Sequence, residues 1–286
     1  MHTHHRISAL LAALSGAFAV ALTANAMGAE VKYDPGDNVK FTYCYSHPPA
    51  IKIKPGDTVI TSTRDASNDV FAPTDKTLMN KLDLTKVNPQ TGPFYIDGAE
   101  PGDTVVIRIN KLEPARDHGI SSFFPGFGAL NGTDRTAVLG EELPEKVWFY
   151  DVDRAKGVAR TKSLDGKSSW EVPLAPFLGC LGVSPGQEVR STIVPDFFGG
   201  NMDCPEVRAG NTVSLGVNVP GALLSFGDGH YVMGDGEIIG TPYCWATRPP
   251  ASESEDATSP STATTLSSVI RRVTAVPASC DFPWSS

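Results

Sequence analysis

Two short acidic motifs in the last third of the chain have the residue types for hydrolytic chemistry. Asp228-Gly-His230 and Asp235-Gly-Glu237 each separate two functional side chains by one glycine. In an extended segment such side chains lie on the same face, so Asp228 could converge with His230, and Asp235 with Glu237. Carboxylates with an imidazole suit a zinc-like divalent ion that activates water. The alternative is that the Asp-Gly pairs only mark hairpin turns.

A third motif, Gly199-Gly-Asn201-Met-Asp203, brings an amide and a carboxylate together. Asn201 is a candidate for binding an oxyanion or the amide of a substrate. Asp203 is a candidate metal ligand or acid. The same residues also fit a turn without any function.

Two other motifs offer nucleophiles. Cys180 and Cys204 lie near these segments, and a thiol beside a base can attack an amide; a small buried hydrophobe is the commoner role of a free cysteine. Gly182-Val-Ser184-Pro185-Gly186 matches the Gly-x-Ser-x-Gly string of a nucleophile elbow. In that elbow the N–H after the serine helps to bind the oxyanion. Pro185 has no N–H, so we expect Ser184 to lie in a turn.

The elements that must position these residues are mainly strands. Apolar and polar residues alternate over five stretches, as half-buried strands do: residues 39–45, 51–54, 104–112, 147–152 and 212–219. Three Pro-Gly turns lead into β-rich stretches and fit type II geometry: residues 34–37, 54–57 and 100–103. Residues 78–84 are the best candidate for a short helix. The pattern predicts a mainly β fold, a sandwich or barrel with a few short helices.

The N-terminus predicts export. Residues 1–26 contain a short basic stretch, an apolar run and the small-residue site Ala24-Asn25-Ala26, which is the layout of a secretory signal peptide. The apolar run is shorter than the roughly 20 residues of a spanning helix, so we expect cleavage rather than a membrane anchor. The mature protein is then secreted or periplasmic. Whether it forms a homo-oligomer stays open.

Export limits the residues that remain for chemistry. His2, His4 and His5 leave with the signal peptide, so only His47 and His118 could join His230 as a third metal ligand. Solvent-facing or packing roles are the alternative for both. The five cysteines include at least one unpaired thiol. The net charge of −8 argues against nucleic-acid binding, which needs basic surface.

The C-terminal segment differs in composition. After Pro249, a run to residue 265 has no aromatic residue and no aliphatic residue larger than alanine. Such a run cannot bury enough apolar surface to offset its ordering entropy. We therefore divide the chain into residues 1–26 (signal peptide), 27–241 (catalytic unit) and 242–286 (flexible, low-complexity tail).

The stretch from Gly199 to Thr241 resembles the acetamidase/formamidase family. It contains Gly199-Gly-Asn-Met-Asp203, Val219-Pro-Gly-Ala-Leu223, Gly227-Asp-Gly-His230 and Gly234-Asp-Gly-Glu-Ile-Ile-Gly-Thr241. Matches also occur upstream, at residues 88–103 and 176–185. The sequence departs from the family pattern at Phe198, often histidine in relatives, and after Thr241, where Pro242 replaces the usual Ala-φ-Glu continuation (φ, apolar). A frameshift or real divergence would produce the second change.

The resemblance implies a β-rich hydrolase that cleaves the carbon–nitrogen bond of short linear amides, such as formamide or acetamide, and releases ammonia. Asp203, Asp228 and His230 are the expected metal ligands, with zinc the expected ion. Glu237 is the expected base and later acid. Asn201 is expected to bind the substrate or its oxyanion. The alternative is an inactive relative that binds a small amide or a metal.

Overall fold

The structure is a computed structural model that describes residues 28–72, 74–128, 144–163, 165–241, 243–245 and 264–271. The predicted signal peptide and most of the predicted tail lie outside the described residues, so export stays a prediction. None of the described residues belongs to a helix long and apolar enough to cross a membrane.

The strands form three sheets. A five-stranded sheet has the order β1-β5-β19-β7-β16. Its strands are β1 (Glu30–Lys32), β5 (Thr58–Thr61), β7 (Thr104–Lys111), β16 (Thr212–Gly216) and β19 (Thr264–Arg271). A two-stranded sheet pairs β3 (Thr42–Cys44) with β13 (Val189–Ser191).

The largest sheet has twelve strands in the order β11-β10-β9-β8-β18-β17-β12-β15-β14, and β6 joins it as a branch that pairs with β17, β2 and β4. The strands are β2 (Val39–Lys40), β4 (Ile51–Ile53), β6 (Gln90–Ile96), β8 (His118–Phe123), β9 (Lys146–Asp153), β10 (Val158–Lys162), β11 (Ser169–Pro173), β12 (Phe177–Gly182), β14 (Pro195–Asp196), β15 (Gly199–Asn201), β17 (Leu224–Val232) and β18 (Tyr243–Trp245). The predicted mainly β fold is confirmed.

The two large sheets pack face to face around the main core. On β7, Val105, Ile107 and Ile109 are completely buried and alternate with more exposed residues. They join side chains of β6, β12 and β17 in one cluster, in which the rings of Phe94 and Phe226 stack at 5.6 Å. Alternation along β7 therefore did predict which face points inward.

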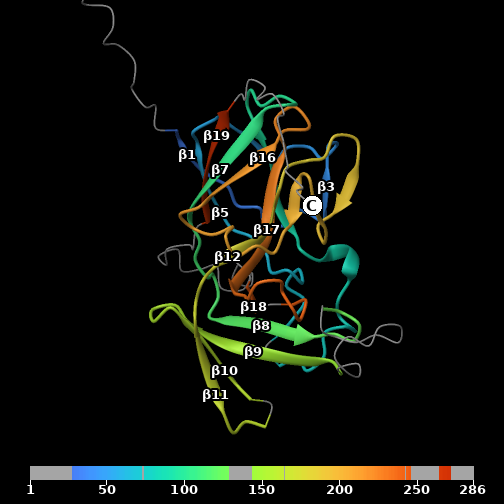
Figure 1. Cartoon of the computed structure of the whole chain (residues 1–286), viewed down its shortest axis with the longest axis vertical. Helices are drawn as coiled ribbons and strands as arrows, with labels where there is room; N and C mark the ends of the chain where they lie inside the picture. The colour runs from blue at the N-terminus through green and yellow to red at the C-terminus, as the bar shows by residue number, and fades with distance from the viewer. Residues whose placement is uncertain are drawn as a thin grey trace, which may run out of the picture.

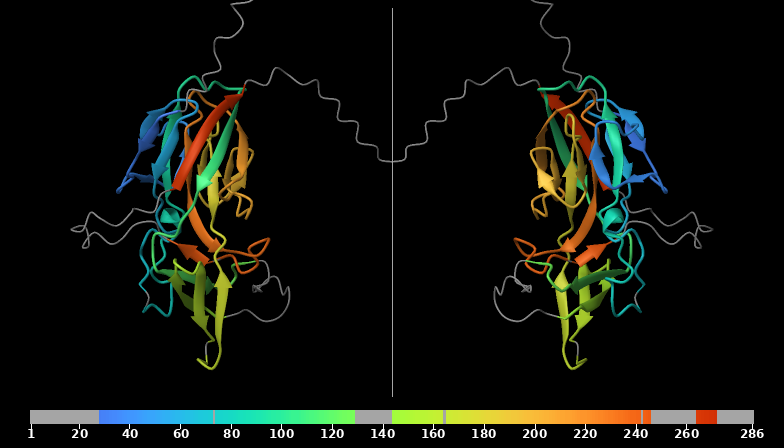
Figure 2. Two further views of the ribbon diagram at one scale, coloured as in Figure 1. Left: turned by 90° about the vertical axis from the view of Figure 1, so that its left-hand side faces the viewer. Right: turned by 90° about the vertical axis from the view of Figure 1, so that its right-hand side faces the viewer.

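The strands β8 to β11 extend away from this sandwich. In Figure 1 they lie below it, and β17 runs from the sandwich down to β18 at the junction. The side views in Figure 2 show the same division. A second, smaller core forms there around Tyr150, Val152, Ala159 and Tyr231.

The Pro-Gly turns form as predicted at two positions and shift by one residue at the third. Asp57 N–H donates to the Lys54 carbonyl at 3.0 Å, and Asp103 N–H to the Glu100 carbonyl at 2.9 Å. Gly56 and Gly102 have φ values of 93° and 94°, which type II turns require at this position. In the first turn, the corresponding bond runs from Asn38 N–H to the Pro35 carbonyl at 2.8 Å.

The predicted helix at residues 78–84 is wrong. Lys81 and Leu82 N–H groups bond the Leu78 carbonyl, at 2.9 and 3.0 Å, but the turn does not continue. The side chain of Asp83 instead accepts from Thr85 N–H and caps a 3-10 helix, η1 (Leu84–Lys86), the one helix among the described residues. An aspartate that caps a new turn competes with helix continuation.

The flexible tail predicted for residues 242–286 is wrong for two segments. β18 pairs with β17 and β8. β19 pairs antiparallel with both β5 and β7 and so completes the five-stranded sheet. The other residues of the predicted tail lie outside the described residues.

Because β19 lies between two strands, its loss leaves edges of β5 and β7 unpaired. We expect deletion of residues 264–286 to lower Tm by at least about 5 °C, since each kcal/mol of lost stability lowers Tm by roughly 2–4 °C in a chain of this size. Differential scanning calorimetry checks this. A chain that ends at Arg271 keeps β19 and is the control; equal Tm values for both deletions would contradict the pairing.

Candidate active site

Neighbouring strands of the large sheet carry the candidate site. On β17, Leu224 and Phe226 lie in the main core, and Asp228 and His230 follow in the same alternation. β12 runs antiparallel beside it, with Leu178 opposite Gly229 and Phe177 opposite His230. The ring of Phe177 contacts the imidazole, with centroids 4.5 Å apart. The core that fixes β17 thereby also fixes these two polar side chains.

The structure brings Asp203, Asp228 and His230 together. His230 Nε2 lies 3.2 Å from Asp228 Oδ2 and 3.6 Å from Asp203 Oδ1. One candidate ligand atom from each residue lies within 4.8 Å of the other two. Asp228 and His230 are almost completely buried, at 3% and 1% exposure. The predicted convergence of Asp228 with His230 is present, and Asp203 joins them.

Several atoms of this cluster lack hydrogen-bond partners within the described part of the protein. They are Asp203 Oδ1 and both ring nitrogens of His230. Most buried polar side-chain atoms in proteins are hydrogen-bonded, and leaving one unpaired costs roughly 1–3 kcal/mol. The arrangement therefore fits a cluster whose unpaired atoms bind an ion or a polar ligand.

Gly179 on β12 provides the space at the centre of the cluster. A Cβ atom there would lie 2.4 Å from Asp228 Oδ2 and 2.7 Å from both Asp203 Oδ1 and His230 Nε2. Zinc lies about 2.0–2.2 Å from such oxygen and nitrogen ligands. The space that a side chain at position 179 would fill therefore lies at nearly the distance of a zinc ion from all three ligand atoms. The cluster is a candidate metal centre.

Backbone contacts hold Asp203 at this position. The Gly179 carbonyl accepts from Met202 N–H at 2.9 Å and from Asp203 N–H at 3.2 Å. Upstream, Gly199 and Gly200 have φ values of 88° and 91°, and a Cβ atom on either would lie within 2.6 Å of a backbone oxygen. Two glycines are therefore needed for β15 to approach the neighbouring backbone this closely, and this approach positions Asp203 in the cluster.

Unusual backbone angles coincide with the site. Asn88, Asp203, Asp228 and Glu237 all have positive φ, between 44° and 51°. Such angles are uncommon for residues other than glycine, and strained conformations cluster at functional sites. The surrounding sheets hold these side chains in orientations that relaxed strands would not give.

Asn201 does not have the geometry predicted for an oxyanion donor. Its Nδ2 group already donates to Asp203 Oδ2 at 2.8 Å and to the Ile193 carbonyl at 3.2 Å. Its Oδ1 accepts from Asn88 Nδ2 at 3.0 Å and from the Cys180 thiol at 2.8 Å. Because both amide hydrogens are used, this arrangement favours a role for Asn201 in orienting Asp203.

Glu237 lies beside Asp203 and not beside Asp235. Burial, the charge of Asp203, a hydrogen bond to Asp203 and the charge of Asp228 raise the pKa of Glu237 to about 9. Burial and the charge of Asp228 also raise the pKa of Asp203 to about 6. Asp235 is exposed in a turn, so the expectation that it would converge with Glu237 is wrong.

The structure also separates other candidates from the cluster. His47 bonds Thr42 Oγ1 at 2.8 Å, and His118 contacts Asp117 at 3.2 Å. Neither belongs to the group of candidate ligands found among the described residues, which favours the alternative, solvent-facing or packing roles, for both. Ser184 is buried beyond the end of β12, and its hydroxyl donates to the Pro185 carbonyl.

Cys180 lies next to the site but its thiol is held neutral. Burial and the charges of Asp228 and Asp203 raise the pKa of Cys180 well above its ordinary value. The thiolate is the reactive form, so this setting opposes a nucleophilic role. Cys44, Cys180 and Cys204 are free cysteines.

Sequence reasoning missed two residues of the site, Gly179 and Asn88. Both lie in upstream segments that match the family pattern, at residues 176–185 and 88–103. The match indicated that these two segments are important in the family. It did not predict that Gly179 and Asn88 lie next to the acidic motifs, because both are distant from those motifs in the sequence.

Asp203 and Asp228 of the cluster line a cavity of about 620 Å³, whose walls also include Asn88, Asn201 and Glu237. Its remaining walls come from residues 65–87, 120–128 and 240–241, with Ile193. A mostly β scaffold that presents buried carboxylates and an imidazole to a cavity is an arrangement suited to hydrolysis.

The chain belongs to the acetamidase/formamidase family. The family model matches residues 38–194 and 186–246, most of the chain. This confirms the resemblance seen in the acidic motifs. Phe198, where relatives often have histidine, is completely buried and packs against Tyr43 at a ring distance of 5.1 Å.

Solved structures show the same fold. An acetamidase from Bacillus halodurans is 28% identical with a TM-score of 0.69, over 85% of this chain and 71% of that one. An acetamidase from Yersinia enterocolitica is 32% identical, also with a TM-score of 0.69, over 84% of this chain and 68% of that one.

Curated relatives match by sequence. An acetamidase from Mycolicibacterium smegmatis is 24% identical over 61% of this chain and 52% of its own length. The chain spans about half the length of the curated relatives it matches.

The space beside Gly179 can be tested directly. Gly179→Ala places a methyl group 2.4–2.7 Å from the three candidate ligand atoms, so we expect zinc binding to weaken at least about tenfold, as it does when even residues around a metal site are changed. Calorimetric titration of the metal-free protein with zinc measures this.

Gly216→Ala on β16 is the matched control, because a Cβ atom there meets nothing within 4 Å. Circular dichroism and Tm check that both variants fold. Unchanged zinc affinity in folded Gly179→Ala would contradict the candidate metal centre.

Proposed function

We propose that this protein is an amidohydrolase that cleaves the carbon–nitrogen bond of linear amides and releases ammonia. The observation that carries the proposal is the convergence of Asp203, Asp228 and His230 around Gly179, with unpaired buried atoms, beside a cavity. Family membership supports the same chemistry.

A zinc-like divalent ion fits the residues present. Two carboxylates and an imidazole are suitable zinc ligands, and a catalytic zinc site has three protein ligands and an open position. Asp203, Asp228 and His230 would hold it. When bound, such an ion polarises a carbonyl and lowers the pKa of water.

The protein's own residues then orient the substrate and move protons. Asn201 holds the Asp203 carboxylate in place through its Nδ2 group. Glu237, on the cavity wall beside Asp203, is the proton-transfer group. It takes a proton from the attacking water and later gives it to the leaving nitrogen. Burial and the charges of Asp203 and Asp228 raise the pKa of Glu237 to about 9, so Glu237 is protonated in the metal-free site at neutral pH. A bound divalent ion would offset these two charges and favour the carboxylate form of Glu237, which is the form that accepts the proton from water.

A second candidate function is an inactive relative that binds a small amide or a metal. The observation that favours it is the departure of the sequence from the family pattern after Thr241, where Pro242 follows. Only the first function requires Glu237 for turnover.

Glu237→Gln distinguishes these functions. The change keeps the shape of the side chain and removes proton transfer, so we expect ammonia release to fall roughly a hundredfold or more. His230→Ala should abolish both zinc binding and release. The measurement is coupled detection of ammonia from linear amides, with zinc content determined for each variant.

Asp235→Asn is the matched control, because Asp235 belongs to the same motif but is exposed. Its activity should equal that of the wild type. Turnover that survives both Glu237→Gln and His230→Ala would contradict the site. Zinc binding without release of ammonia from any amide would favour the inactive relative.

A further inference from the structure

The cavity beside the metal centre is much larger than the smallest amides. A water molecule occupies about 30 Å³ in the liquid, so a molecule of the size of acetamide would fill on the order of a fifth of the cavity. The volume of about 620 Å³ lies in the range of pockets that enclose much larger organic ligands.

Apolar side chains form much of the cavity wall outside the candidate metal centre. They come from the segment before β6, from β8 and from the loop after β8: Phe71, Leu78, Met79, Leu82, Ile120 and Phe124. Leu78, Ile120 and Phe124 are buried and form a hydrophobic cluster of their own, with Phe71 and Leu82 packed against it. The wall therefore belongs to a packed core.

The polar groups of this wall already have partners. Asp65 Oδ1 accepts from Ser67 N–H at 2.8 Å. Ser121 Oγ bonds Tyr150 Oη at 2.8 Å, and Ser122 Oγ bonds Thr241 Oγ1 at 3.1 Å. By contrast, Oδ1 of Asp203, in the candidate metal centre, has no hydrogen-bond partner among the described residues. A ligand in this cavity can thus bond polar atoms at the candidate metal centre and meets mainly apolar side chains on the rest of the wall.

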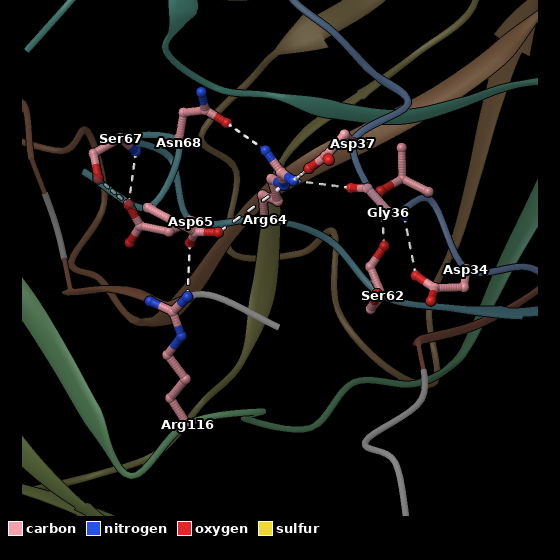
Figure 3. Close-up of polar contacts among 11 residues, drawn as sticks. Asp34, Gly36, Asp37, Ser62, Arg64, Asp65, Ser67, Asn68 and Arg116 are labelled. Atoms are coloured by element: carbon pink, nitrogen blue, oxygen red, sulfur yellow. Dashed lines mark hydrogen bonds and ion pairs between the residues drawn. The ribbon is translucent and has the colours of Figure 1, made fainter. Parts of the chain in front are cut away.

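Ion pairs and hydrogen bonds hold the loop that carries part of this wall. Figure 3 shows Arg64 among Asn68, Asp37 and the Gly36 carbonyl, with bonds of 3.1 Å to Asn68 Oδ1 and 3.0 Å to Gly36 O. Arg116 donates to Asp69 Oδ1 at 2.7 Å. These contacts therefore anchor the loop, and a preformed wall loses little entropy when a ligand binds.

The rim is apolar as well. Met79 and Phe127, both on the cavity wall, are 44% and 46% exposed. Large apolar side chains that line a pocket and remain exposed gain free energy when a ligand covers them. The rim therefore extends the apolar surface outward from the buried part of the wall.

From these observations we infer that the preferred substrate is a primary amide with a bulky apolar acyl group, branched or aromatic, in place of formamide or acetamide. The inference rests on the proposed amidohydrolase function. The amide group lies at Asp203, Asp228 and Glu237, and the acyl group lies against Leu78, Ile120 and Phe124. Water attacks the carbonyl carbon, the carbon–nitrogen bond breaks, and the products are the apolar carboxylic acid and ammonia.

The test compares phenylacetamide with acetamide in zinc-loaded protein. We expect kcat/KM to be at least about tenfold higher for phenylacetamide, since burial of a ring against apolar walls is worth more than one factor of ten. Isothermal titration calorimetry measures binding of the same two amides to Glu237→Gln, so that the pocket is tested without turnover.

Phe127→Asp places a carboxylate in the apolar wall. We expect it to lower phenylacetamide affinity and kcat/KM at least about tenfold. Phe197→Asp makes the same change at a residue that is 58% exposed and does not line the cavity, and it should change neither.

The outcomes separate the two claims. Higher kcat/KM for acetamide, or equal sensitivity of Phe127→Asp and Phe197→Asp, would overturn the acyl pocket and leave the amidohydrolase function intact. Release of no ammonia from either amide would overturn the proposed function and, with it, a substrate of this class. Calorimetry would then still show whether the cavity selects apolar groups.

Discussion

The close approach of β12 to three polar side chains is the constraint on which the site depends. Gly179 has no side chain, so Asp203, Asp228 and His230 can point into the same small volume. Its carbonyl also accepts from the backbone N–H groups of Met202 and Asp203. One residue thus provides both the space and the backbone anchor. A β-sandwich whose strands pair in fixed register can hold such a point to a fraction of an ångström, and a site for a metal ion requires this precision.

The same constraint carries an energetic cost that the fold must offset. Buried polar atoms without partners, such as Asp203 Oδ1 and the ring nitrogens of His230, destabilise the folded state. The core around Phe94, Phe226 and the buried residues of β7 supplies the opposing stabilisation. β17 belongs both to this core and to the site, since Leu224 and Phe226 precede Asp228 and His230 on the same strand. Folding and construction of the site are therefore consequences of the same strand pairing.

Local patterns predicted much of the fold and part of the site. Alternation along residues 104–112 identified β7, and the spacing of Asp228 and His230 identified a shared face, because both are properties of one extended segment. The partner of Glu237 was missed. Asp235 is two residues away in the sequence, but the chain turns there. Burial and the charge of Asp203, which follows β15, raise the pKa of Glu237 instead. Likewise, β19 was missed because local composition does not show pairing with distant strands. The residues of β19 form a strand by pairing with β5 and β7, which lie far upstream in the sequence.

Asn201 shows why residue type alone does not determine a role at such a site. An exposed asparagine amide can donate to an oxyanion, and nothing in the sequence shows whether its hydrogens are free. In the fold, Asp203 Oδ2 and the Ile193 carbonyl take both of them, and Asn88 and Cys180 donate to its oxygen. Each bond fixes the next, so the network reaches from the Asn88 loop through Asn201 to the carboxylate of Asp203. Oδ2 of Asp203 is therefore held by Asn201, and Oδ1 is the oxygen that faces the candidate metal centre without a hydrogen-bond partner among the described residues. The directionality of one amide group thus decides which carboxylate oxygen is left available.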